Sequence, residues 1–206
     1  MLFTIMVNLQ TSQANEPIKL PPPQLDSGLP LMKALQLRQS TRNFDSKQLN
    51  LQDLSNLLLA AFGINRKESG KRTAPSAMNW QEIDIYVALK NGTFLYDAKS
   101  HILKPINDKD IRKLTGKQYF VEEAPVNLIY VADWNRMKYA NEENKIIWSA
   151  VDAGSIMQNV YLYCASQALA TVARGLFDKE ALSKALHLNP EQKVILCQTV
   201  GYPKKI

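Results

Sequence analysis

Apolar residues recur every three or four positions in two segments near the start of the chain, residues 29–38 and 50–62. This spacing places them along one face of a helix. Pro30 suits the first turn of the first segment, while Asn50 can cap the second segment and Gly63 can end it. The pattern therefore predicts two short amphipathic helices joined by a loop.

The apolar spacing changes to every second residue in the middle of the chain, which is the period of a strand. Residues 82–90 (EIDIYVALK) follow this alternation after a loop rich in Gly, Pro and charge at 63–76. Asn91-Gly92 comes next and is a strong hairpin signal, because both residues tolerate a positive φ. Further strands are predicted at residues 93–96, 102–106, 126–132 and 193–200.

The longest helical pattern runs over residues 142–169 and is apolar on more than one face, which predicts burial. Its small residues, such as Ala153 and Gly154, would let another helix or a planar ligand approach closely, although an ordinary internal helix would also account for them. Shorter helices are predicted at residues 108–114, after an Asn107 cap, and at 178–186. Helices and hairpin-linked strands together indicate an α+β fold.

Composition fits one globular domain, since 206 residues with 46% hydrophobic content can bury a substantial core. Twenty-five Lys and Arg against 19 Asp and Glu give a formal charge of +6, which favours anionic ligands. Aromatic residues do not alternate with the basic ones, so no nucleic-acid partner is expected. No run approaches ~18 apolar residues, so no membrane span is expected either.

Cysteine and histidine are scarce and isolated. Cys164 and Cys197 stand in apolar surroundings, which predicts buried free thiols. His101 and His187 have no neighbouring ligand set, so we assign them structural roles and predict no metal site.

The sequence predicts an extended N-terminal arm over residues 1–29, which contains Pro21-Pro22-Pro23. Ser12-Gln13-Ala14 resembles a small-residue cleavage site, but no basic residue precedes the short apolar run, as an export signal requires. We therefore expect a cytoplasmic protein, or an exported one if this start is the remnant of a signal. The remaining residues, 30–206, are predicted to form one domain.

Candidate chemistry is confined to donor-rich segments, because the chain has no G-x-S-x-G, H-E-x-x-H, P-loop or G-x-G-x-x-G motif. The segments are R-Q-S-T-R at 38–42, P-S-A-M-N at 75–79, Arg174-Gly175 and Lys204-Lys205. Guanidinium groups bind phosphate oxygens in a bidentate manner, and lysines add compact charge. Taken singly, each segment has an ordinary alternative: solvated arginines or a pair with Asp45, a turn without a ligand, or a loop glycine.

The order of five segments narrows these alternatives. They are R-Q-S-T-R-N-F at 38–44, A-P-S-A-M-N at 74–79, D-A-G-S-I-M-Q-N-V-Y-L from 152, A-L-A-T-V-A-R-G-L-F-D at 168–178 and V-G-Y-P-K-K at 200–205. In this order and spacing the chain resembles the nitroreductase family of flavin enzymes, in particular its thiazoline-oxidase-like, SagB-type branch. The resemblance covers residues 30–205.

The resemblance implies a nitroreductase-like α+β fold, with a central mixed, mainly antiparallel sheet flanked by helices. It also implies a homodimer with the long helix around Gly154 at its interface, where two FMN molecules would be held. Matched by position, the FMN-binding residues would be Arg38, Gln39, Ser40, Arg42, Pro75, Ser76, Ala77, Met78, Asn79, Arg174, Gly175, Lys204 and Lys205.

Roles follow from the same match. Residues 38–42 would bind the phosphate, ribityl chain or pyrimidine edge, and the two lysines would add phosphate contacts. Residues 75–79 would line the isoalloxazine, and backbone groups at 174–175 would face its hydride-accepting nitrogen. Two departures stand out: Gly175-Leu176 replaces the family's glycine pair, and the chain ends three residues after Pro203. Wrapping of the partner subunit would then be reduced, or done by the N-terminal arm.

No catalytic side chain is expected, because the flavin itself carries the redox chemistry. The resemblance implies ping-pong reduction of small electron-poor acceptors, such as nitroaromatics or quinones, at the expense of NAD(P)H. Two alternatives stay open: an FMN-dependent dehydrogenase or oxidase acting on a heterocycle, and a non-catalytic flavin-binding protein.

Overall fold

A computed structural model describes residues 16–204 of the chain. Its centre is a seven-stranded sheet in the order β1-β6-β5-β4-β7-β9-β8, in which all neighbouring strands are antiparallel. Its strands are β1 (Ile18–Lys19), β4 (Ile83–Leu89), β5 (Gly92–Asp97), β6 (Ile102–Asn107), β7 (Val126–Asp133), β8 (Ala170–Arg174) and β9 (Gln192–Gly201). The predicted α+β fold with a central, mainly antiparallel sheet is confirmed, and the sheet of residues 16–204 contains no parallel pair.

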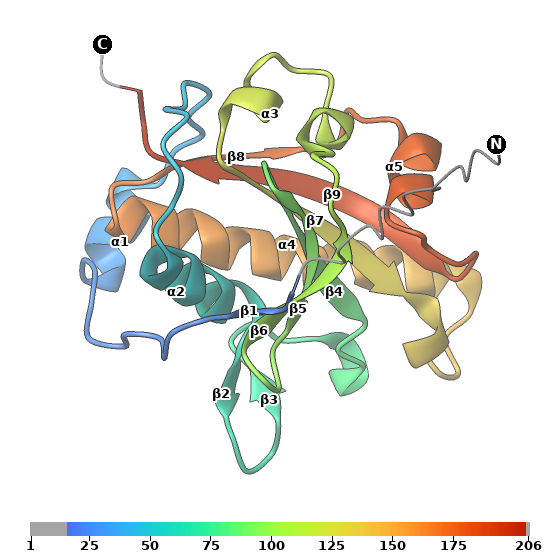
Figure 1. The fold of residues 1–206 in the computed structure, drawn as a ribbon. Helices are drawn as coiled ribbons and strands as arrows, with labels where there is room; N and C mark the ends of the chain where they lie inside the picture. Colours follow the sequence, from blue (N-terminus) through green and yellow to red (C-terminus); the bar gives the residue numbers. More distant parts are fainter. Residues whose placement is uncertain (1–15, 205–206) are drawn as a thin grey trace, which may run out of the picture.

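Helices cover both faces of the sheet (Figure 1). On one face, α2 (Leu51–Phe62) and the long α4 (Glu142–Ser166) pack on inward-facing strand residues, among them Ile85. On the other face, α5 (Lys179–Ala185) packs on residues such as Tyr86. Successive strand residues reach opposite faces because side chains alternate along a strand. The first helix, α1 (Leu31–Leu37), packs against α4.

Helix starts are fixed by the capping residues that the sequence indicates. The Asn50 side chain accepts from the Asp53 amide at 2.7 Å, and Asp178 does the same for Ala181 at 3.0 Å. Asn141 caps α4 in the same way. Each cap satisfies an amide that the first helical turn leaves unpaired.

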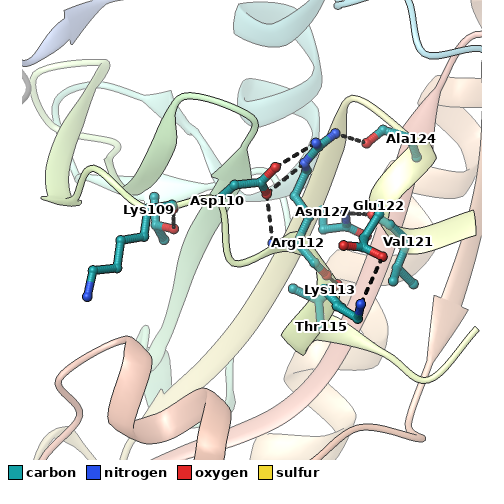
Figure 2. A network of polar contacts seen from close by, with 10 residues as sticks. Lys109, Asp110, Arg112, Lys113, Thr115, Val121, Glu122, Ala124 and Asn127 are labelled. Atoms are coloured by element: carbon teal, nitrogen blue, oxygen red, sulfur yellow. Dashed lines mark hydrogen bonds and ion pairs between the residues drawn. The ribbon is translucent and has the colours of Figure 1, made fainter.

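The helix predicted at residues 108–114 is wrong: the segment contains only a 3₁₀ turn, η2 (Arg112–Thr115). The Asn107 side chain accepts from the Lys109 amide, which closes a local turn in place of a helix. Arg112 is buried, pairs with Asp110 and donates to the Ala124 carbonyl at 2.9 Å (Figure 2). These side-chain bonds set the path of the segment.

Several short elements were not predicted, among them β2 (Ile64–Arg66), β3 (Lys71–Arg72), α3 (Phe120–Glu123) and β8. The expected loop at 63–76 contains a hairpin of β2 and β3. The turn after η2 continues into α3, a one-turn helix. The long helix ends at Ser166, because Ala168 adopts a φ of 54°, and strand β8 follows.

The arm predicted at the N-terminus is extended where the structure describes it, and Ile18 pairs with Leu103 at the edge of the sheet. The candidate cleavage site at residues 12–14 lies outside the described residues. Both thiols are free and buried, as predicted, and burial raises the pKa of Cys197 to about 12. Within residues 16–204, no helix is long and apolar enough to cross a bilayer.

Candidate functional site

Three of the donor-rich segments lie side by side. The Thr41 amide donates to the Thr171 carbonyl at 2.9 Å, and the Lys204 amide donates to the Asn43 carbonyl at 3.2 Å. Phe44 is buried and forms a β-bridge with Pro203. We call residues 38–45, 171–175 and 202–204 the Arg38 cluster. Lys205 lies outside the described residues.

Tyr161 of α4 contacts two segments of this cluster. Its hydroxyl accepts from the Ala173 amide at 2.9 Å and shares a hydrogen bond of 2.9 Å with the Ser40 hydroxyl. The Arg38 guanidinium lies over the Tyr161 ring, 5.5 Å from its centroid. A backbone amide, a hydroxyl and a cation from distant segments are thus fixed around one phenol.

The cations of the cluster are free to meet an anion. Within the described part of the chain, Arg38, Arg42 and Lys204 form no ion pair, and Arg42 and Lys204 are exposed. Asp45 was the expected ion-pair partner of the arginines. Its side chain accepts from the Lys47 amide at 2.8 Å instead. Cations without ion pairs on adjoining segments suit a dianionic phosphate.

Arg174 does not offer its side chain to this surface. The guanidinium is buried and donates to the Thr115 carbonyl and to the Asn127 carboxamide oxygen, the latter at 2.6 Å. Both acceptors belong to the network of Figure 2. Burial lowers the pKa of Arg174 to about 10. Its side chain therefore braces the junction, and only its backbone can face a ligand.

The junction itself is open. A Cβ built on Gly175 would meet no atom within 4 Å, so a planar group has room to approach this backbone. A cavity of ≈540 Å³ adjoins the cluster on the α4 side, lined among others by Gln39, Thr41 and Tyr161. Unpaired cations beside an open backbone fit a phosphate-bearing planar cofactor such as FMN.

The remaining donor segment is a strained turn at residues 75–81, which we call the Pro75 turn. Met78, Asn79 and Gln81 adopt φ values of 50°, 54° and 48°, a conformation that costs non-glycine residues energy. The turn is held by internal bonds, since the Gln81 amide donates to the Ser76 hydroxyl at 2.9 Å. Met78 is 82% exposed at its tip.

Two acidic residues beneath this turn were missed by sequence reasoning. Asp152 of α4 accepts from the Ala77 amide at 2.8 Å, and Glu82 is completely buried just after the turn. Burial, and then the nearby Asp152 carboxylate, raise the pKa of Glu82 to about 7. The only sequence signal was a carboxylate directly before a strongly apolar strand.

The Pro75 turn and the Arg38 cluster are separate in this chain. Across residues 16–204, no hydrogen bond or ion pair joins them. They attach to α4 at Asp152 and Tyr161, nine residues or roughly 13 Å apart along the helix. The chain thus brings together three of the four predicted segments, and the fourth contacts α4 at a different position.

Comparison with known proteins identifies the family of the chain. The model of the nitroreductase family matches residues 35–202. A predicted nitroreductase of Methanocaldococcus jannaschii is 29% identical over 174 residues, covering 80% of this chain and 86% of that protein. The FMN reductase (NAD(P)H) of Bacillus subtilis is 23% identical over 184 residues, covering 84% of this chain and 61% of that protein.

A solved structure matches nearly the whole fold. The crystal structure of a predicted nitroreductase from Ralstonia eutropha JMP134 has a TM-score of 0.89 and 42% identity, covering 94% of this chain and 92% of that chain. Family model, sequence and fold therefore agree, and this chain belongs to the nitroreductase family of FMN-dependent oxidoreductases.

Proposed function

We propose that the Arg38 cluster binds FMN and that the protein uses NAD(P)H to reduce small electron-poor acceptors. The observation that carries this proposal is that the three segments of the Arg38 cluster adjoin one another, bearing Arg38, Arg42 and Lys204 without ion pairs and an open backbone at Gly175. When bound, FMN would supply hydride transfer between NAD(P)H and an acceptor such as a nitroaromatic or a quinone.

The residues of the cluster take complementary roles in this proposal. Arg42 and the two C-terminal lysines, Lys204 and Lys205, bind the phosphate, and Arg38 and Ser40 hold the ribityl chain or the pyrimidine edge. Positive charge at that edge stabilises negative charge on the ring electrostatically. The backbone at 174–175 faces the ring, with the Arg174 side chain bracing it from behind.

We further propose that a homodimer completes each site, with the Pro75 turn of one subunit lining the flavin held by the Arg38 cluster of the other. Two observations support this. The turn and the cluster attach to α4 far apart in one chain, and α4 exposes apolar side chains that a second copy would cover. These side chains are Ile146, Ile147, Trp148 and Val151, all at least 41% exposed.

The first test is whether purified protein carries flavin absorbance, or takes up added FMN in proportion to subunit concentration. Flavin-loaded protein is then titrated with NADH and NADPH without oxygen. We expect one of the nucleotides to bleach the flavin, and a quinone to restore it. Protein that neither holds nor takes up FMN would refute the proposal.

The same titration separates the alternative enzymes. Bound flavin that neither nucleotide bleaches would point to an oxidase of a heterocyclic substrate, with oxygen as electron acceptor. Bound flavin without turnover on any donor and acceptor pair would point to a non-catalytic flavin-binding protein. Either result would overturn NAD(P)H-driven reduction while leaving FMN binding in place.

A further inference from the structure

We propose that Glu82 and Asp152 share one proton, and that this carboxyl–carboxylate pair is the positioning device of the Pro75 turn. The two residues are 70 positions apart in sequence and lie next to the turn, with Glu82 directly before β4 and Asp152 on α4. Within residues 16–204, no hydrogen bond or ion pair connects this carboxyl pair with the Arg38 cluster. The expected effect of the pair on FMN binding rests on the proposed function, whereas its expected effect on the order of the turn does not.

The first observation is an orphaned carboxyl group. Both Glu82 side-chain oxygens are inaccessible to solvent, and neither accepts a hydrogen bond from another described residue. A buried carboxylate without partners is strongly unfavourable. Such a group avoids this cost by keeping its proton and donating it to an acceptor.

The second observation is that the acceptor is present. Asp152 is 3% exposed and close enough for a side-chain hydrogen bond with Glu82. A hydrogen bond from protonated Glu82 favours the ionised form of Asp152. Ionised Asp152 is in turn a charge-assisted acceptor for the Ala77 amide, at 2.8 Å. A proton on Glu82 therefore strengthens the contact that holds the turn.

The surrounding charges do not neutralise a second carboxylate. Arg136, the cation whose charge acts on Glu82, already pairs with Asp84 and lies 3.6 Å from Asp133, and it also donates to the Gln81 carbonyl. Arg72 of β3 is the other cation nearby, and donates to the Gln81 side chain at 2.7 Å. Arg136 thus already serves two other carboxylates, those of Asp84 and Asp133, before Glu82 is ionised.

Loss of the proton would act directly on a strained segment. Three residues of the turn hold positive φ angles that relax unless the surroundings enforce them. When Glu82 ionises, two carboxylates repel each other beside the Ala77 amide. We therefore expect the Pro75 turn to be ordered while the proton is shared and loosened once it leaves.

The test is amide hydrogen exchange across residues 76–81 in flavin-free protein, measured between pH 5.5 and 9 and corrected for the intrinsic pH dependence of exchange. We expect protection of the Ala77 amide to fall by roughly tenfold or more as Glu82 titrates, since each unit of pKa difference corresponds to a tenfold change. In Glu82→Gln the neutral amide still donates to Asp152, so protection should persist at high pH.

Two further variants sharpen the test. Asp152→Ala removes the acceptor for the Ala77 amide and should lose protection at every pH. Glu68→Gln makes the same chemical change at an exposed position in the β2–β3 turn and should behave as the wild type. Equal pH dependence in the wild type and in Glu82→Gln would overturn the proposal, even if Asp152→Ala fails to fold.

A second readout follows FMN affinity with pH. We expect the wild type to bind FMN more weakly above the titration of Glu82, and Glu82→Gln to bind equally across the range. If FMN does not bind at all, the proposed function fails, while the exchange experiment still decides the fate of the carboxyl pair. If exchange follows the proposal and affinity does not, the pair positions a turn that FMN does not use, and the flavin part of the proposal is overturned.

Discussion

Glu82→Gln should make the protein more stable at alkaline pH, although it changes one atom of a fully buried side chain. The native carboxyl group has a pKa of about 7, against 4.5 as the ordinary value. The folded state therefore binds this proton more tightly than the unfolded state. Glutamine is close in shape, keeps a donor for Asp152 and cannot ionise, so the substitution isolates the cost of burying the charge.

The magnitude follows from the linkage between proton binding and folding. Below pH 4.5 the carboxyl group is protonated in both states, so its ionisation costs no stability. As the pH rises towards 7 the group ionises first in the unfolded chain, and stability falls. Above pH 7 both states are ionised and the loss stays constant, at about 3 kcal/mol for a pKa difference of this size.

The assay is urea unfolding of flavin-free wild type and variant at pH 5, 6, 7 and 8, at one protein concentration, because bound FMN or self-association would add stability of its own. Between pH 5 and pH 8 the variant should gain about 2.5 kcal/mol relative to the wild type. Glu68→Gln, at the surface, should show no such change. A stability difference that stays constant over this range would refute the reasoning.

Three further predictions address the site and its support. Arg38→Ala and Arg42→Ala should each weaken FMN binding by roughly tenfold to a hundredfold while circular dichroism stays unchanged, since each removes a charge-assisted bond; unaltered affinity in both would leave them as solvated arginines. Gly116→Ala places a Cβ 2.2 Å from the Arg174 guanidinium and should lower stability by roughly 1–3 kcal/mol in thermal unfolding, whereas an unshifted Tm would contradict the close packing there. Val151→Glu puts a charge on the exposed apolar face of α4 and should weaken self-association in sedimentation, and an unaltered assembly would remove this face from the interface.

Elements that depend on local chemistry were predictable from the sequence. The α2 helix begins where Asn50 accepts from the Asp53 amide, a bond within four residues. The β4–β5 hairpin was predicted from Asn91-Gly92 and forms there with a shift of one residue: Leu89 pairs with Gly92, so the turn lies at Lys90–Asn91, and of the predicted pair only Gly92 has a positive φ, of 144°. In both cases the residues that decide the structure are neighbours, so a short window contains the whole cause.

Elements that depend on side-chain partners were not predictable in this way. The segment after Asn107 has helical composition, yet Arg112 is drawn to Asp110 and to the distant Ala124 carbonyl. Strand β8 was hidden because its apolar residues continue the pattern of the preceding helix. The helical segment is broken by the positive φ of Ala168, and an alanine gives no sequence signal for that conformation.

The site shows the same division. The sequence identifies Arg174 as a donor, but not the direction of its side chain. In strand β8 successive residues face opposite sides of the sheet. The Arg174 guanidinium reaches Asn127, while the backbone amide of Ala173, in the edge strand of the sheet, donates to Tyr161 near the cluster. One short motif thus supplies both the surface of the site and its internal brace.

Glu82 and Asp152 are the residues whose role depends most on tertiary structure. Each alone resembles a solvated charge at the edge of an apolar segment, and nothing in the sequence relates two positions 70 residues apart. Only the packing of α4 under the Pro75 turn removes both from water, and burial is the largest cause of the raised pKa of each. Their chemistry is therefore a property of the tertiary structure. It arises where a strained turn needs an acceptor that the neighbouring charges cannot replace.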